Sequence, residues 1–209
     1  MISTPAASHP HDMPAVELRN PALAAFLAWL VPGAGHLYQG RTGKGLLYMV
    51  CILGTFFYGL YLGDGKVVYA SWRPNDTRWA YFCQVGVGLA ALPALVQAER
   101  SASGRGPLFG LKIMTPPAGH EQWQNEAAQA RAAGQGPAEL QKYDSPDELA
   151  WWNKHLYRYF ELGTVYTMIA GLLNVLAVYD ALAGPVPLEV RDDEDETEKK
   201  SPANEPQPV

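Results

Sequence analysis

Residues 45–63 read GLLYMVCILGTFFYGLYLG and contain no charged side chain. The hydrocarbon core of a bilayer is about 30 Å thick, so a helix needs about 20 apolar residues to cross it. A buried helix of a soluble protein normally carries a polar stripe at a spacing of about 3.6 residues, and this stretch has none. The stretch therefore predicts a helix that spans a membrane.

Three further windows of similar length and composition lie at residues 20–40, 79–98 and 162–179. Lys, Arg, Asp and Glu collect between these windows and at the two ends of the chain. This is expected because a charge at the centre of a bilayer costs at least about 2.5 kcal/mol. We therefore predict an all-α polytopic membrane protein with about four transmembrane helices. A soluble bundle with buried core helices is the alternative.

The windows divide the chain into regions of different character. In chain order we expect a flexible N-terminal arm at 1–19, a three-span membrane region at 20–98 that begins with a helical hairpin, a polar connection at 99–161 that ends in an amphipathic interfacial helix at 146–160, a fourth span at 162–184, and an acidic, Pro-rich disordered tail at 185–209.

The end of the polar connection predicts a helix with one apolar face, because Leu149, Trp152 and Leu156 share that face. Such a helix is typical of the membrane interface. A helix that packs on the rest of the connection outside the membrane is the alternative. The aromatic residues Tyr69 and Trp72, together with nearby Trp79, are expected in an interfacial belt at headgroup depth.

Small residues predict which helix faces touch. Helices in lipid associate through close packing, so small side chains mark the contacts. They recur at a spacing of four residues in the second and third windows, at Gly59 and Gly63, and at Gly86, Ala90, Ala94 and Ala98.

Polar residues inside the windows are the places to look for chemistry. They are Gln84, Asn174 and Asp180, together with His36. An amide in hydrocarbon must find a hydrogen-bond partner on another helix, and Asn174 lies deepest. We favour a structural role for these groups. A polar path for transport through His36, Asn174 and Asp180 is the alternative.

Motifs for defined chemistry are missing from the sequence. It has no HExxH or CxxC spacing, no GxSxG elbow and no phosphate-binding GxxxxGK[ST] loop. It also lacks a basic stripe for nucleic acid. We therefore predict no catalytic residue, no metal, no cofactor and no nucleic-acid partner, and expect that the protein is not an enzyme.

The turn between the first two windows carries a recognisable motif. Its residues are Pro32, Gly33, Gly35, His36, Tyr38, Gly40, Arg41 and Gly45. In these positions the sequence resembles the two-transmembrane-helix domain family, over about forty residues. It departs from that family by two further spans and by lacking the acidic residue commonly seen before the arginine. The whole chain also resembles an uncharacterised bacterial membrane-protein family, a domain of unknown function.

The same motif has a physical interpretation. Pro32, Gly33 and Gly35 can break the end of the first helix and free backbone carbonyls, which a neighbouring side chain must satisfy in lipid. His36 is placed to do so.

These observations favour a non-enzymatic scaffold or partner-binding module in the membrane, which the resemblance identifies as the bacterial inner (cytoplasmic) membrane. Its partners are the lipid bilayer and, beyond it, other membrane proteins or a second copy of the chain. The alternative function is that of a small transporter or channel.

Overall fold

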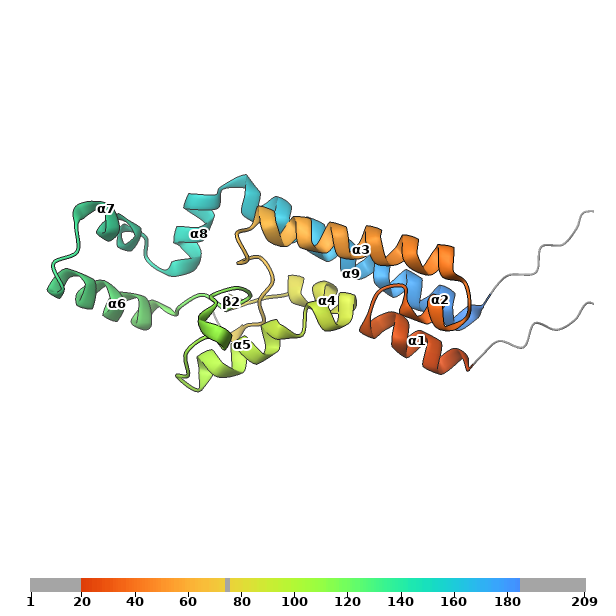
Figure 1. The fold of residues 1–209 in the computed structure, drawn as a ribbon. Coiled ribbons are helices and arrows are strands. Elements are labelled where there is room, and N and C mark those ends of the chain that lie inside the picture. The colour runs from red at the N-terminus through yellow and green to blue at the C-terminus, as the bar shows by residue number, and fades with distance from the viewer. Residues whose placement is uncertain (1–19, 74–75, 185–209) are drawn as a thin grey trace, which may run out of the picture.

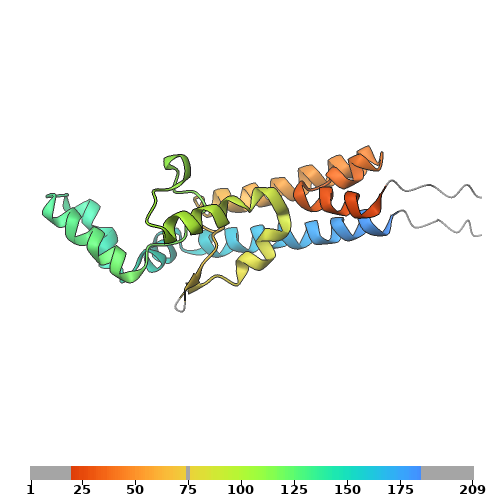
Figure 2. The same cartoon turned by 90° about the horizontal axis from the view of Figure 1, so that it is seen from below.

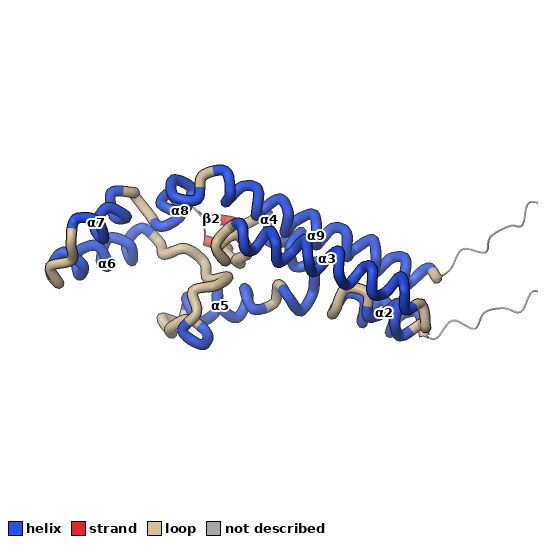
Figure 3. Tube along the Cα trace, turned by 45° about the horizontal axis from the view of Figure 1, so that its top comes forward, coloured by secondary structure: helices blue, strands red, loops and turns tan. Residues whose placement is uncertain are grey.

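The computed structural model describes residues 20–73 and 76–184, and the predicted arm at 1–19 and tail at 185–209 lie outside these residues. The described chain is mostly helical (Figure 3). Its first half contains α1 (Pro21–Leu30), α2 (Ala34–Tyr38), α3 (Thr42–Leu62), β1 (Trp72–Arg73), β2 (Asp76–Thr77), α4 (Ala80–Gln84), the 3-10 helix η1 (Val85–Ala90) and α5 (Pro93–Ala102). The second half contains the 3-10 helix η2 (Leu108–Gly110), α6 (His120–Ala132), α7 (Pro137–Leu140), the 3-10 helix η3 (Gln141–Asp144), α8 (Glu148–Leu156) and α9 (Arg158–Ala183).

Helices α3 and α9 run side by side along the molecule (Figures 1 and 2). Among the described residues these two helices, of 21 and 26 residues, are each long and apolar enough to cross a membrane. They approach closely where Gly59 faces Gly163, because a Cβ atom on Gly59 would lie 2.8 Å from the Gly163 carbonyl oxygen. Small residues thus bring the two backbones together, as membrane helices require.

The first predicted crossing is corrected by the structure. Helix α1 has only ten residues, which is about half of the length needed to cross a bilayer. The chain then turns at Gly33, which has a φ of 83°, and α2 folds back so that Gly35 packs against Ala24 and Ala28. Residues 20–40 therefore form a short helical hairpin and not a continuous span, because Pro32 and Gly33 interrupt the helix.

The third predicted crossing is bent. Helix α4 and η1 meet α5 at an angle of 116° after a short break, so this segment is either a broken span or a re-entrant loop. The bend follows Gly88, whose φ of 77° needs glycine. A Cβ atom there would lie 1.9 Å from the carbonyl oxygen of Trp29 in α1. The described residues therefore contain two continuous candidate spans, or three if the bent pair is one, where the sequence predicted about four.

The small residues predicted to mark helix contacts do not all pack against another helix. Gly86 faces Gly171 of α9, and a Cβ atom on it would lie 2.6 Å from the Gly171 carbonyl oxygen. Gly63 packs against Val67. Ala94 is buried in the main core, and Ala90 and Ala98 pack against that core. Because the bend separates η1 from α5, the four-residue repeat from 86 to 98 does not form one helix face.

Beyond the ends of α3 and α9, the helices α6, α7 and α8 form a separate arm (Figure 1). Helix α6 has its own small core, in which Trp123 packs against Tyr143 and donates its indole N–H to the Ser145 carbonyl at 3.0 Å. Trp152 of α8 is buried against Tyr69 and Phe160. The apolar face of α8 is thus covered by protein, and its position at a membrane surface stays a prediction.

The aromatic belt is only partly as expected. Trp72 and Trp79 are exposed, but Tyr69 is completely buried and donates its hydroxyl to Asp76 Oδ1 at 3.2 Å. Burial raises the pKa of the Tyr69 hydroxyl above its ordinary value. Tyr69 is therefore a neutral core residue and not a member of the belt.

The close approach of α9 to α4 yields a stability prediction. A Cβ atom on Gly171 would lie 1.9 Å from the Cys83 carbonyl oxygen, whereas one on Gly54 of α3 would meet nothing within 4 Å. We expect Gly171→Val to lower the free energy of unfolding by about 3 kcal/mol or more, or to prevent folding, because two backbones must separate. Gly54→Val is the matched control. Equal melting temperatures of the two variants in detergent would contradict this contact.

Candidate functional site along helix α9

Helix α9 carries four polar side chains that bond to other parts of the chain, and three of them, Thr164, Thr167 and Asn174, lie near one face at helical spacing. Starting from the end near the α6–α8 arm, the four are Thr164, Thr167, Asn174 and Asp180. Thr167 and Asn174 are completely buried. These side chains therefore form a series of polar contacts along the length of α9.

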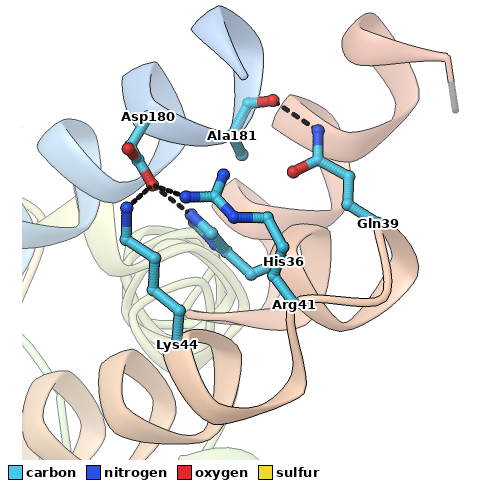
Figure 4. A network of polar contacts seen from close by, with 6 residues as sticks. All are labelled: His36, Gln39, Arg41, Lys44, Asp180 and Ala181. Carbon is cyan, nitrogen blue, oxygen red and sulfur yellow. Dashed lines mark hydrogen bonds and ion pairs between the residues drawn. The ribbon is translucent and has the colours of Figure 1, made fainter. Parts of the chain in front are cut away.

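Asp180 collects three basic side chains at the end of α9 (Figure 4). Its Oδ2 atom lies 2.6 Å from Nε2 of His36, 2.7 Å from Nζ of Lys44 and 3.4 Å from Nη2 of Arg41. His36 is completely buried, whereas the side chain of Asp180 is 30% exposed. Because Arg41 and Lys44 bring two positive charges to one carboxylate, the cluster is cationic even with a neutral histidine.

The turn motif holds this cluster in place. Gly40, with a φ of 81°, lets the chain turn from α2 into α3, and the Arg41 amide donates to the His36 carbonyl at 2.8 Å. The side-chain amide of Gln39 donates to the Ala181 carbonyl at 2.7 Å. The Gln39 bond holds the C-terminal end of α2 next to the end of α9.

The other motif residues make this turn compact. A Cβ atom on Gly33 would lie 2.1 Å from the Gly45 carbonyl oxygen, so the hairpin and the start of α3 need glycine at their contact. Tyr38 packs against the cluster formed by Ala24, Ala28 and Ala181. The motif therefore brings together α1, α2, α3 and α9.

Asn174 satisfies carbonyls that the broken segments leave free. Its Nδ2 atom donates to the Ala28 carbonyl of α1 at 3.1 Å and to the Gly86 carbonyl of η1 at 2.9 Å. From the sequence we predicted that His36 would hydrogen-bond to the freed carbonyls of the first helix. The imidazole contacts Asp180 instead. The prediction was wrong because the hairpin turns the imidazole towards the end of α9, away from the carbonyl end of α1.

Two further contacts lie nearer the α6–α8 arm. Gln84 is completely buried, and its Nε2 atom donates to Thr167 Oγ1 at 2.8 Å and to the Val67 carbonyl at 3.1 Å. Arg78 donates to Thr164 Oγ1 at 2.8 Å and to the same Val67 carbonyl at 3.1 Å.

Sequence reasoning missed four members of these contacts: Arg78, Lys44, Thr164 and Thr167. The two threonines share the helical spacing of Asn174, at seven and ten residues before it, and that spacing is a signal that would have found them. Arg78 lies in a connection and Lys44 in the first turn of α3 beside the glycine-rich turn, where charge is ordinary, so the sequence carried no signal for their contacts.

Some polar atoms in this series have no protein partner among the described residues. They include Oδ1 of Asn174, Oε1 of Gln84 and Nδ1 of His36, all of which are buried. In the part of the chain that the structure describes, no three His, Cys, Asp or Glu side chains come together in a way that could hold a metal ion. Chemically, the arrangement can bind hydrogen-bond donors or hold helices together.

The model of a protein family of unknown function matches residues 23–194, which is most of the chain. The chain belongs to the DUF6677 family. The uncharacterised-family resemblance of the whole sequence is thereby confirmed, whereas the resemblance of the turn to the two-transmembrane-helix domain stays a prediction. No curated protein and no solved structure matches this DUF6677 chain.

The contacts of Asn174 generate a second prediction. Asn174→Leu keeps the volume but leaves the Ala28 and Gly86 carbonyls without their donor in an apolar region. We expect a loss of about 1–3 kcal/mol in the free energy of unfolding, measured with denaturant in detergent. Leu176→Ala, at a position that is 64% exposed, is the control and should change it little. If both variants were as stable as the wild type, Asn174 would not hold the broken segments.

Proposed function

We propose that this chain is a non-enzymatic scaffold in a bacterial inner (cytoplasmic) membrane, which binds another membrane protein or a second copy of itself. One observation carries the proposal. The polar groups along α9 bond to other elements of the same chain, while the α6–α8 arm extends beyond the ends of both spans (Figure 1). The membrane part is thus held together internally, and the arm is presented outwards.

The small-residue contacts support this division of roles. Gly59 meets Gly163, and Gly86 meets Gly171, so these faces are used within the chain and are closed to a partner helix. A partner must therefore use another surface. The arm offers one, because the outer face of α6 is polar and exposed, while its inner face carries Trp123, which packs against Tyr143.

Photo-crosslinking from α6 tests the proposal. A photoreactive amino acid at Gln124, an exposed position of α6, should yield a protein adduct of one defined mass in native membranes. The same residue at Leu176, which is exposed on the outer face of α9, is the control and should label lipid. Protein adducts at neither position, with both variants folded and inserted, would argue against a scaffold.

Transport is a second candidate, and one observation favours it. The α1–α2 hairpin is held at one end of α9 by Gln39, and the α4–η1 segment is held towards the other end by Gln84. They meet where Gly88 approaches Trp29, close to the amide of Asn174. Broken helices that meet inside the membrane form the binding sites of many transporters. The unpartnered oxygens of Asn174 and Gln84 are acceptors for a cation or for water.

Cation flux through proteoliposomes tests this candidate. If His36, Asn174 and Asp180 form the path, Asp180→Asn should abolish a flux of protons, sodium or potassium while the protein stays folded, because the neutral amide cannot carry the charge. Asp64→Asn, at an exposed carboxylate that pairs with Lys66, is the matched control and should conduct normally. Unchanged flux in Asp180→Asn would remove transport along this path.

A further inference from the structure

A pocket of about 380 Å³ lies where the spans meet the α6–α8 arm. It is bounded by the connection after α3, the end of α5, the loop around η2, and helices α6 and α8. Its size is at the lower end of the range for small-ligand sites, about 300–1,000 Å³. Charged side chains of both signs line it: Lys66, Arg105, Lys112, Glu126 and Glu148.

The polar groups of this pocket are incompletely paired. Lys66 pairs with Asp64 at 2.6 Å, while Arg105 donates one hydrogen bond to Ser103 Oγ at 3.2 Å and reaches Glu99 only at 3.9 Å. Within the described ranges 20–73 and 76–184, the ammonium of Lys112 has no hydrogen bond or ion pair. The hydroxyl of Thr115 is buried and also lacks a partner in these ranges. A buried hydroxyl without a partner is unfavourable, so the pocket is suited to a ligand with oxygen acceptors.

Two glutamate side chains give the pocket hydrogen-bond acceptors as well as donors. Glu148 accepts a hydrogen bond from the Ala118 amide at 2.7 Å through Oε2, and Glu126 accepts one from Gln122 at 3.2 Å through Oε1. Each carboxylate can accept further bonds through its remaining lone pairs. The pocket therefore offers donors for an anion from the loop around η2 and acceptors for an ammonium from α6 and α8.

An exposed apolar loop borders the pocket. Phe109, at the tip, is 89% exposed and has a φ of 53°, and Leu111 and Ile113 are also exposed. The loop is fixed, because Gln97 donates to the Leu111 and Ile113 carbonyls at 2.9 and 3.0 Å and accepts from the Leu108 amide at 2.9 Å. A fixed apolar tip next to charged groups is typical of a segment that enters a bilayer interface.

The position along the spans agrees with an interface. Lys66 lies four residues after the last residue of α3, and the pocket residue Ser101 lies in the last turn of α5. Tyr61 and Trp79, at the same end of the spans, are 80% and 73% exposed, as expected for aromatic residues at headgroup depth. Helix α5 also carries the exposed apolar residues Leu95 and Val96.

We propose that this pocket binds the headgroup of a phospholipid that carries both a phosphate and a primary ammonium, as phosphatidylethanolamine does. Arg105, Lys112 and Thr115 hold the phosphate, and Glu126 and Glu148 accept hydrogen bonds from the ammonium. Phe109 and Leu111 contact the acyl chains. The site is separate from the outer face of α6 and does not depend on the scaffold role.

Native mass spectrometry of the full-length protein in detergent tests the site. The probes are phosphatidylethanolamine, phosphatidylcholine and phosphatidylglycerol with identical acyl chains. We expect phosphatidylethanolamine to be retained about tenfold more than phosphatidylcholine, because a quaternary ammonium cannot donate to the carboxylates. The joint change Arg105→Gln and Lys112→Gln should lower retention of all three lipids. Glu126→Gln should reduce the preference for phosphatidylethanolamine over phosphatidylglycerol. Lys154→Gln, an exposed lysine outside the pocket, is the control.

Three results would overturn the proposal. One is equal retention of the three lipids by the wild type. Another is wild-type retention of phosphatidylethanolamine by pocket variants whose melting temperatures show that they are folded. The third is displacement of the lipid by soluble glycerophosphoethanolamine at equal concentration, which would assign the pocket to a free solute. Loss of crosslinks from α6 would leave these measurements unaffected, so the two proposals fail separately.

Discussion

The hydrogen bonds from Asn174 to the carbonyls of Ala28 and Gly86 are the interaction on which the rest of the membrane part depends. A helix that stops inside an apolar region leaves carbonyl groups without partners, and each such group is costly where water is absent. Helix α1 stops there, and η1 is kinked there at Gly88. The amide of Asn174 serves both breaks at once, so one residue of the continuous helix α9 joins two interrupted segments.

Close packing and hydrogen bonding act together in this arrangement. Gly171, one turn before Asn174, has no side chain, and this lets the backbone of α4 approach at Cys83. That approach brings Gly86 within reach of the asparagine. Gly88 also has no side chain, and this lets η1 approach the carbonyl of Trp29 in α1. The glycines are therefore required by the same contacts that the amide completes.

The end of α9 near the α1–α2 hairpin is held by charge instead. Asp180 is partly exposed, so each single ion pair there contributes modestly. The buried His36 gives the cluster its specificity, because only one orientation of the hairpin brings the imidazole to the carboxylate. In the scaffold proposal these contacts keep the hairpin bound to α9. The transport candidate requires that the same contacts break and re-form. The pocket proposed to bind a lipid headgroup lies at the opposite end of the spans and is compatible with both.

The sequence by itself determined which segments are apolar, that residues 32–45 form a glycine-rich turn, and that the buried amides need hydrogen-bond partners within the chain. Composition decides these points locally, because a charge-free stretch prefers lipid and a buried amide needs a partner. Only the tertiary structure decided that residues 20–40 turn back and that residues 80–102 bend. Whether a broken helix continues or returns depends on the donors that meet its free carbonyls. For α1 that donor is Asn174, 146 residues away from Ala28 in the chain, and no local pattern identifies such a partner.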